Sequence, residues 1–547
     1  MNIGQSLCFD DVLMEPLLSS ISTRSSINLE TNIATNGRKL IIKTPLISSP
    51  MDTVTETEMA IKMALNGGLG IIHRYMDIDN QVSQVMKVKR FLQYIITEPY
   101  KVSPETTLIE IESVRELYNV SSFCIVDSNN KLLGIITHRD IEYMIEKQKH
   151  IENSNINIID TNYTNYTNYT NHTNNIILKV KDFMSTKLIT LDISMTNHSL
   201  ETTLSIAKEL MLERKIEKIP IVNNSELVGL ITLNNIKHYE NNKEKACIDN
   251  NGALCVGAAV GIIGDYLERL DKLIAVGVDL ICIDVANGFN ENVFNAIALI
   301  RNKYKKIVLM VGNVCNWQGY KALTDYDVDC IRVGVGNGSI CTTRLETGIG
   351  KGQFSAVYEC YNYKIEHKTI PNIICDGGSL GKTGNKMKAL ACGASAIMLG
   401  RTLASTEESP GTIIYRNGKR FKYIRGMAST MANLSKQEKI DFKTLSINNS
   451  NGNEIKKENK NEIKKENKKE NKLKTKFTAE GVDGEQELTG SVVDVIEQIN
   501  GGLKSGFSYL GCNNITEVHK KLAEGKIKFN IVTSIGMSET GIRVKSY

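Results

Sequence analysis

Residues 332–360 read RVGVGNGSICTTRLETGIGKGQFSAVYEC and continue an apolar run, 328–333, that is typical of a buried strand. Glycines alternate at positions 334, 336 and 338, and Cys341 follows them. Glycine lets the backbone of such a loop approach a bound ion closely. A cysteine at the exit of a strand is therefore a candidate nucleophile, and the plainer interpretation is a free thiol in an ordinary strand-to-helix turn.

Short apolar runs recur along the rest of the chain, separated by helix-like stretches such as 265–276 and 290–304. The eight runs are 45–48, 70–73, 254–258, 280–283, 307–311, 330–333, 373–375 and 396–399. This alternation predicts an α/β fold, a (β/α)8 TIM barrel, with a doubly wound open sheet as the alternative. In such a barrel the residues that come after the runs share one mouth, namely Met51, Asp284, Asn313, Cys341, Asp376 and Gly400.

Size and composition narrow the class of protein. The chain has 547 residues, 66 basic and 61 acidic, so we expect two or more domains and no nucleic-acid partner. Its 12 cysteines form no CxxC pair, which is typical of free thiols in a reducing compartment. No apolar stretch approaches about 18 residues and no signal pattern precedes the fold. We therefore expect no membrane span and a cytoplasmic location, with a peroxisome-like organelle left open.

Residues 98–240 interrupt the barrel series and contain an internal repeat. The stretch CIVDSNNKLLGIITHRDI at 124–141 is matched by IPIVNNSELVGLITLNNI at 219–236. We predict an inserted domain here, between a first barrel part at 1–97 and a second at 241–547. Two low-complexity segments, 161–175 and 451–476, cannot bury enough apolar surface to fold alone, and the second lies in a predicted mobile flap at 428–484.

The repeated motifs GIITHRD at 134–140 and GLITLNN at 229–235 resemble a tandem of cystathionine-β-synthase (CBS) motifs. That resemblance implies a regulatory domain that binds purine nucleotides such as GMP, GTP or ATP. Thr137, Asp140 and Thr232 match its nucleotide contacts, whereas Asn235 stands where a ribose-binding aspartate is expected.

The barrel resembles the inosine-5′-monophosphate (IMP) dehydrogenase / guanosine-5′-monophosphate (GMP) reductase family. The motifs that carry this resemblance are FDDVL at 9–13, SSPMDTV at 48–54, GIIH at 70–73, the Cys341 loop, DGG at 376–378 and TEESPG at 406–411. The resemblance implies a purine nucleotide substrate, GMP or IMP, a nicotinamide cofactor and a homotetramer that can pair into octamers.

The two branches of that family share the attack of a cysteine thiolate on C2 of the purine and differ in the later steps. The dehydrogenase hydrolyses the adduct with an Arg-Tyr pair in its flap, and no arginine, and hence no such pair, occurs between Gly426 and Gly484. The stretches CTTR at 341–344, TGIG at 347–350 and DVANG at 284–288 resemble the reductase, while SSPMDTVTE and TEESPG resemble the dehydrogenase. We therefore expect NADPH-dependent reductive deamination of GMP to IMP with release of ammonia. IMP dehydrogenase is the alternative, and a non-catalytic nucleotide-sensing assembly protein is a second one.

The resemblance also assigns residues to roles. Cys341 would be the nucleophile, and Thr343 with Glu480 would pass a proton to the departing ammonia, although Glu480 can also be read as a solvated charge. Asp284, Asn287 and Asn313 would face the nicotinamide, and carbonyls of Gly334, Gly336 and Cys341 would hold K+. Arg401 fits a phosphate contact or a surface substitution equally well. The substrate set is Ser49, Met51, Arg332, Ser339, Asp376, Gly378, Gly400, Arg401, Gly426 and Met427.

Overall fold

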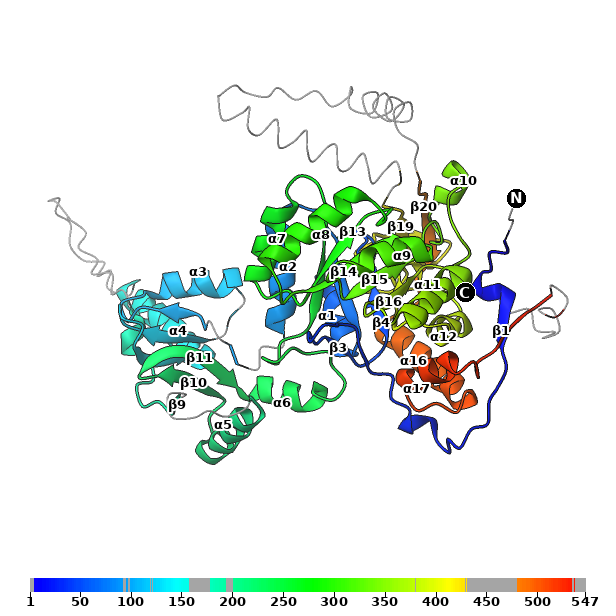
Figure 1. The fold of residues 1–547 in the computed structure, drawn as a ribbon. Coiled ribbons are helices and arrows are strands. Elements are labelled where there is room, and N and C mark those ends of the chain that lie inside the picture. Colours follow the sequence, from blue (N-terminus) through cyan, green and yellow to red (C-terminus); the bar gives the residue numbers. More distant parts are fainter. Residues whose placement is uncertain are drawn as a thin grey trace, which may run out of the picture. The chain divides into compact units, whose positions relative to one another are not determined.

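The computed structural model describes residues 4–91, 95–96, 99–118, 120, 122–156, 178–192, 200–378, 380–427, 429, 480–533 and 536. The chain forms two compact units, one from residues 1–91 and 243–547 and the other from residues 92–242 (Figure 1). Both low-complexity segments and nearly all of the predicted flap lie outside the described residues. Of the helices that are described, none is long and apolar enough to cross a membrane.

The larger unit is a closed barrel of eight parallel strands, which confirms the predicted TIM-barrel fold. In chain order the strands are β4 (Leu46–Ser48), β5 (Leu69–Ile72), β12 (Val256–Val260), β13 (Leu280–Asp284), β14 (Val308–Val314), β15 (Cys330–Val333), β16 (Asn372–Asp376) and β17 (Ala396–Leu399). The barrel closes where β17 pairs with β4 in the register Ile397 to Leu46. All eight apolar runs of the sequence became these strands, with ends shifted by at most a few residues.

The strands read as continuous apolar runs because both of their faces are buried. Ile71, Cys282, Met310 and Ile374 belong to one cluster that fills the barrel. The cysteines of the strands serve as small core residues, and burial raises the pKa of Cys282 and of Cys375 to about 12.

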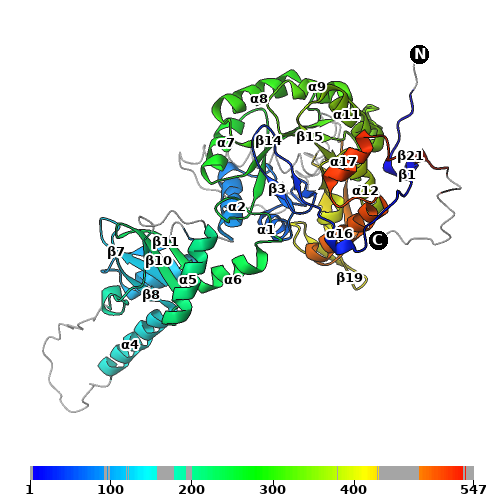
Figure 2. The same ribbon diagram turned by 60° about the horizontal axis from the view of Figure 1, so that its bottom comes forward.

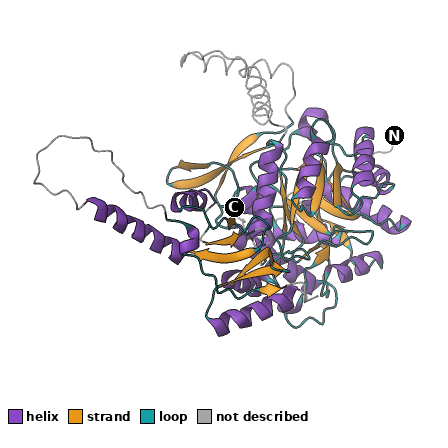
Figure 3. Cartoon of the chain, turned by 90° about the vertical axis from the view of Figure 1, so that its left-hand side faces the viewer, coloured by secondary structure: helices purple, strands orange, loops and turns teal. Residues whose placement is uncertain are grey.

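Helices surround the strands on the outside (Figure 2 and Figure 3). They are α1 (Thr57–Leu65), α2 (Ile78–Phe91), α7 (Tyr266–Ala275), α8 (Glu291–Lys303), α9 (Trp317–Thr324), α10 (Thr343–Thr347), α11 (Gln353–His367), α12 (Thr383–Ala391), α13 (Arg401–Ala404), α16 (Val492–Tyr509) and α17 (Ile515–Ala523). Asparagine side chains begin three of them, because Asn290 accepts from the amide of Asn292, Asn316 from that of Gly319 and Asn514 from that of Glu517. The helices predicted at 265–276 and 290–304 correspond to α7 and α8.

Small sheets join segments of this unit that lie outside the barrel strands. An antiparallel sheet joins β18 (Ile413–Arg416), β19 (Lys419–Arg425) and β20 (Asp483–Glu487), so that Arg425 pairs with Asp483 across the flap. A hairpin of β2 (Thr31–Asn32) and β3 (Ile41–Ile42) lies near the amino-terminal ends of the barrel strands. The short elements η1 (Phe9–Asp11), β1 (Val12–Met14), η2 (Arg24–Ser26) and β21 (Phe529–Ile531) complete this unit, with β1 paired to β21.

The smaller unit contains two three-stranded sheets of the same design. The first half consists of β6 (Lys101–Val102), α3 (Leu108–Tyr118), β7 (Ser122–Val126), β8 (Leu132–Thr137) and α4 (His138–Ile156), followed by η3 (Val180–Asp182). The second half consists of β9 (Leu191–Asp192), α5 (Leu200–Arg214), β10 (Lys218–Asn223), β11 (Glu226–Thr232) and α6 (Leu233–Asn242). In each half a short strand runs parallel to one arm of an antiparallel hairpin, as the internal repeat of the sequence suggests.

A buried aspartate ties the amino-terminal side of the barrel together. Asp329 precedes β15, is fully buried, and accepts from Arg301 at 2.8 Å, from Arg38 at 2.9 Å and from the amide of Leu309 at 2.9 Å. The carboxylate thereby connects the β2–β3 hairpin, α8 and β14.

We expect the substitution Asp329→Asn to lower the free energy of unfolding by about 3–5 kcal/mol, because two largely buried guanidinium groups lose their shared counter-charge. Denaturant unfolding followed by circular dichroism measures the change. The control Asp271→Asn removes the same charge from an exposed pair with Lys303 and is expected to leave the midpoint nearly unchanged. Equal effects of the two substitutions would contradict this role for Asp329.

Candidate functional site

One buried arginine joins the carboxyl ends of three barrel strands. Arg332, in β15, is 5% exposed; its Nη1 donates to Asp284 of β13 at 2.7 Å and its Nη2 to Asp376 of β16 at 2.8 Å. Burial alone would lower the pKa of Arg332, but the two carboxylates raise it well above the usual range. The guanidinium therefore stays charged and fixes both carboxylates at one mouth of the barrel.

The side chain of Asp376 is fixed through one carboxylate oxygen, and the other oxygen is available to a ligand. Its Oδ2 accepts from Arg332 and also from Asn313 Nδ2, at 2.8 Å. Asn313, in β14, donates as well to the carbonyl of Gly334 at 2.6 Å. The Oδ1 atom of Asp376 accepts no hydrogen bond from the described residues, and the side chain is partly exposed. This geometry suits a carboxylate that accepts hydrogen bonds from ligand hydroxyls.

The loop that carries Cys341 depends on glycine at its first turn. Gly334 has φ +148°, and a Cβ atom there would lie 2.0 Å from the carbonyl oxygen of Asp376. The side chain of Gln353, which is 1% exposed, supports the same turn: its Nε2 donates to the carbonyls of Val333 at 2.6 Å and Asp376 at 3.1 Å. The sequence assigned Gln353 no role, because no local pattern distinguishes a buried glutamine that supports a loop from any other glutamine in a helix.

Cys341, Thr343 and Glu480 form a continuous chain of polar contacts. The Cys341 Sγ lies 3.1 Å from Thr343 Oγ1, and that hydroxyl donates to Glu480 Oε2 at 2.8 Å. A carboxyl group placed behind a hydroxyl in this way can move a proton to or from a group bound at the thiol. Three residues that the sequence analysis grouped only by resemblance thus lie together.

Backbone pairing explains how Glu480 reaches a loop 137 positions earlier in the chain. Its carbonyl accepts from the amide of Thr342 at 2.9 Å, and Gly481 forms an isolated antiparallel bridge with Cys341. Further along, the amide of Val482 donates to the carbonyl of Ile340 at 3.0 Å. Since Arg425, just before the predicted flap, pairs with Asp483, near its end, the two ends of the flap meet at the cysteine loop.

Several predicted substrate residues also lie close together. A Cβ atom on Gly400, at the end of β17, would lie 3.4 Å from Met51 Sδ and 3.9 Å from Ser49 Cβ. A Cβ atom on Gly426 would lie 3.0 Å from the carbonyl oxygen of Ile340, one residue before the cysteine. These contacts place Ser49 and Met51 beside the end of β17, and Gly426 beside the cysteine loop.

Other predicted residues lie apart from this cluster or are otherwise engaged. Arg401 is exposed and its Nε donates to Gln486 at 3.1 Å. Asn287 is exposed and accepts from the amide of Phe289 in its own loop. The amide of Gly378, predicted to bind phosphate, donates to the carbonyl of Asn337 at 2.9 Å. Ser339 is exposed, and Met427, the last residue described before the flap, is half-buried.

The K+ site predicted from the sequence would consist of backbone carbonyl oxygens. Gly334 and Gly336 both have positive φ angles, 148° and 71°, in the loop that precedes Cys341. Within the described ranges no group of three or more His, Cys, Asp or Glu residues could hold a metal ion. The Gly334 carbonyl already accepts from Asn313 and retains a second lone pair.

The structure adds two side chains, Arg74 and Tyr75, to which sequence reasoning assigned no role. They follow β5 at the same mouth, and Arg74 Nη2 donates to the carbonyl of Asp284 at a long 3.5 Å. The Arg74 guanidinium lies 5.2 Å from the centre of the Tyr75 ring. Burial, followed by the nearby charge of Asp284, raises the pKa of Tyr75 to about 12, so this phenol stays protonated near neutral pH.

In the smaller unit the predicted regulatory residues occupy equivalent positions in the two halves. Thr137 donates to Asp140 Oδ2 from its amide and its hydroxyl, both at 2.7 Å. Thr232 donates to Asn235 Oδ1 at 2.7 Å, so the second half has an amide where the first has a carboxylate.

A model of the IMP dehydrogenase / GMP reductase domain matches residues 6–543 of this sequence. The chain belongs to the IMP dehydrogenase / GMP reductase family. It is therefore an oxidoreductase of purine metabolism, and a family of this kind uses a nicotinamide cofactor.

Relatives in this family carry two different names. The chain is 36% identical to the IMP dehydrogenase of Nitrosopumilus maritimus, over 95% of each sequence, and 34% identical to that of Bacillus subtilis, over 98% and 95%. Among solved structures it is similar to a cysteine-to-alanine variant of Trypanosoma brucei GMP reductase in complex with GMP. That similarity has a TM-score of 0.78 and 30% identity, and covers 99% of this chain and 98% of the other.

We expect Gly334→Ala to lower the free energy of unfolding by about 1–3 kcal/mol, because the added methyl group overlaps the Asp376 carbonyl. Differential scanning calorimetry measures the shift. Gly348→Ala is the control, since Gly348 also has a positive φ, 71°, but a Cβ atom there would meet nothing within 4 Å. If Gly334→Ala lowers the free energy of unfolding no more than Gly348→Ala does, the close approach to Asp376 does not contribute to the effect.

Proposed function

We propose that this chain is a GMP reductase, which converts GMP to IMP and ammonia at the expense of NADPH. The contact chain from Cys341 through Thr343 to Glu480 carries the proposal, since it can protonate a leaving amine. The sequence between Met427 and Asp483 contains no arginine and no tyrosine, so this segment lacks the pair that would activate water in the dehydrogenase. Similarity to Trypanosoma brucei GMP reductase over nearly the whole chain supports the same conclusion.

The proposed reaction uses Cys341 as a covalent catalyst. Its thiolate attacks C2 of GMP and forms an Sγ–C2 bond. The bond between C2 and the exocyclic amine then breaks, and ammonia leaves with a proton that Glu480 delivers through the hydroxyl of Thr343. NADPH, when bound, supplies a hydride to C2. The Sγ–C2 bond breaks last, which releases IMP and restores the thiolate.

The other residues at this mouth would bind and orient the nucleotides. We assign the ribose hydroxyls to the available oxygen of Asp376, and the base and phosphate to the surface between Ser49, Met51, Gly400 and the cysteine loop. Asp284 and Asn313, with Asn287 more exposed, would face the nicotinamide. Arg74 belongs with this group through its contact to the strand end at Asp284.

IMP dehydrogenase is the second candidate, because the curated relatives at 34–36% identity carry that name. It would require another base to activate water. Tyr75, held protonated beside Arg74 at the mouth, is poorly suited to that task near neutral pH.

For the smaller unit we propose a pair of CBS motifs that binds GMP, GTP or ATP and regulates a homotetramer able to form octamers. Thr137 and Asp140 would hold the nucleotide ribose in one half and Thr232 in the other. Trypanosoma brucei GMP reductase has been solved with guanosine 5′-triphosphate, at 26% identity and a TM-score of 0.69 to this chain.

The assay that tests the reaction follows absorbance of the reduced nicotinamide. We expect loss of signal with GMP and NADPH, no change with IMP and NAD, and no turnover for Cys341→Ser, which lacks the thiolate. A rise with IMP and NAD alone would overturn the reductase assignment. Failure of both mixtures in the wild-type chain would favour a nucleotide-sensing protein without catalysis.

Substitutions in the contact chain test the proton path. We expect Thr343→Val and Glu480→Gln each to lower kcat by about 10²- to 10⁴-fold, with Thr343→Ser retaining most activity. Because both residues act on one proton, the double variant Thr343→Val/Glu480→Gln should be little worse than either single variant. Independent, multiplicative losses would argue against a shared path.

A further inference from the structure

An ion pair joins two segments at the mouth that carries the candidate active site. Asp52 lies in the turn after β4, and Arg425 is the last residue of β19, 373 positions later in the chain. Arg425 Nε donates to Asp52 Oδ2 at 2.9 Å, and its Nη2 donates to the same oxygen. The amide of Arg425 also donates to the hydroxyl of Thr53, at 3.4 Å. Side-chain and backbone contacts together hold the end of β19 against the turn.

Both side chains of this pair are largely buried. The exposed fraction is 10% for Asp52 and 20% for Arg425. Burial lowers the pKa of Arg425, but the hydrogen bond to Asp52 outweighs burial and raises that pKa above its usual range. The Oδ1 atom of Asp52 is buried and accepts no hydrogen bond from any residue that the structure describes. Removal of the Arg425 guanidinium would therefore leave an uncompensated carboxylate in a largely buried position.

The turn on one side of the pair is bonded internally and contains two predicted substrate contacts, Ser49 and Met51. The amide of Val54 donates to the carbonyl of Met51 at 2.9 Å. The hydroxyl of Thr55, which is fully buried, donates to the carbonyl of Ser49 at 2.7 Å. Asp52 thus belongs to a turn that has little freedom to move.

The chain on the other side of the pair continues to the segment that contacts the cysteine loop. Gly426 directly follows Arg425, and its amide donates to the carbonyl of Val482 at 3.0 Å. The amide of Val482 donates in turn to the carbonyl of Ile340, also at 3.0 Å. A Cβ atom on Gly426 would lie 3.1 Å from the Cα of Gly481. The end of β19 therefore cannot shift without moving the segment that pairs with the cysteine loop.

We propose that Asp52 and Arg425 form a positioning pair for the reaction at Cys341. The pair would not touch the substrate; it would fix the backbone that places Glu480 beside Thr343. Alignment of this kind matters, since a misplacement of about 1 Å can lower a rate by about 100-fold. Loss of the ion pair would therefore slow turnover even where the fold persists. The kinetic consequence rests on the proposed function, whereas the loosening of the cysteine loop does not.

Steady-state kinetics of the full chain with GMP and NADPH test the catalytic consequence. We expect Asp52→Asn and Arg425→Met each to lower kcat by at least about ten-fold. The double variant Asp52→Asn/Arg425→Met should be little worse than either single variant. Arg425→Lys should lie between wild type and Arg425→Met, because lysine keeps the charge but not the two donors of the guanidinium.

The Michaelis constant separates positioning from a folding defect. Predicted GMP contacts flank both residues, so KM for GMP should rise by at least about three-fold in Asp52→Asn. A partly unfolded sample would lower kcat without changing KM, and an unchanged KM would therefore overturn the proposal. If the wild-type chain oxidises IMP instead, the same comparison is made with IMP and NAD.

Hydrogen–deuterium exchange followed by mass spectrometry gives a readout that is independent of the reaction. The amides of Thr342 and Val482 donate to the carbonyls of Glu480 and Ile340. Loss of the ion pair should speed exchange at these two amides, because the segment that accepts and donates these bonds is less well fixed. The milder Arg425→Lys should show a smaller increase. Exchange at the wild-type rate in every variant would contradict the positioning role, whichever reaction the chain catalyses.

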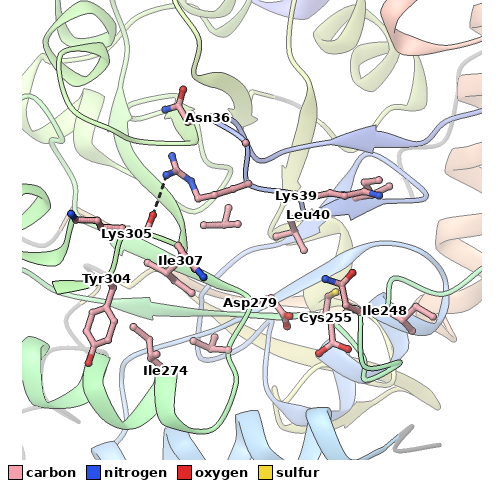
Figure 4. Close-up of a pocket in the computed structure, with 18 of the residues that line it drawn as sticks. Asn36, Lys39, Leu40, Ile248, Cys255, Ile274, Asp279, Tyr304, Lys305 and Ile307 are labelled. Carbon is pink, nitrogen blue, oxygen red and sulfur yellow. Dashed lines mark hydrogen bonds between the residues drawn. The ribbon is translucent and has the colours of Figure 1, made fainter. Parts of the chain in front are cut away.

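The matched control is Asp279→Asn, which removes a carboxylate from another largely buried ion pair. Asp279 directly precedes β13 and lines a cavity at the amino-terminal mouth of the barrel (Figure 4). It lies 2.9 Å from Lys89, and the two side chains are 13% and 9% exposed. We expect a lower melting temperature, with kcat, KM and exchange of the cysteine loop within about two-fold of wild type. Equal kinetic losses in Asp279→Asn and Asp52→Asn would show that general destabilisation explains the effect.

Discussion

The charged contact of Arg332 with Asp284 and Asp376 is the constraint around which the candidate active site is arranged. The three residues stand at the ends of three different strands, and Arg332 is almost fully buried. A buried guanidinium is costly unless carboxylates compensate it, so the two aspartates have little freedom to turn elsewhere. Their fixed position sets the available oxygen of Asp376 and, through Asn313, the first carbonyl of the cysteine loop.

The conformation of the Cys341 loop depends on close packing rather than on charge. Gly334 must pass close to the Asp376 carbonyl, and Gln353 supports the turn from behind. The loop then pairs with residues 480–482, which lie near the carboxyl-terminal end of the predicted flap. Thiol, hydroxyl and carboxyl consequently meet at the rim, where a substrate can reach them.

The two mouths of the barrel use charge differently. At the carboxyl mouth Arg332 is neutralised by two aspartates, and a water-accessible carboxylate oxygen remains. At the amino mouth Asp329 forms ion pairs with Arg38 and Arg301, and Asp279 forms one with Lys89. The arrangement at the carboxyl mouth suits hydroxyl groups of a substrate.

The barrel could be predicted from the sequence, because strands buried on both faces must be continuous apolar runs, and eight such runs separated by helix-like stretches or an inserted domain have few other solutions. The sequence also predicted that Asp284, Asn313 and Asp376 lie at one mouth, since the carboxyl ends of parallel barrel strands all lie on the same side. Only the tertiary structure brought Glu480 to Thr343, because that contact depends on pairing across a long segment without periodicity. The contacts of Gln353 and Arg74 likewise join residues distant in sequence whose proximity no local pattern encodes.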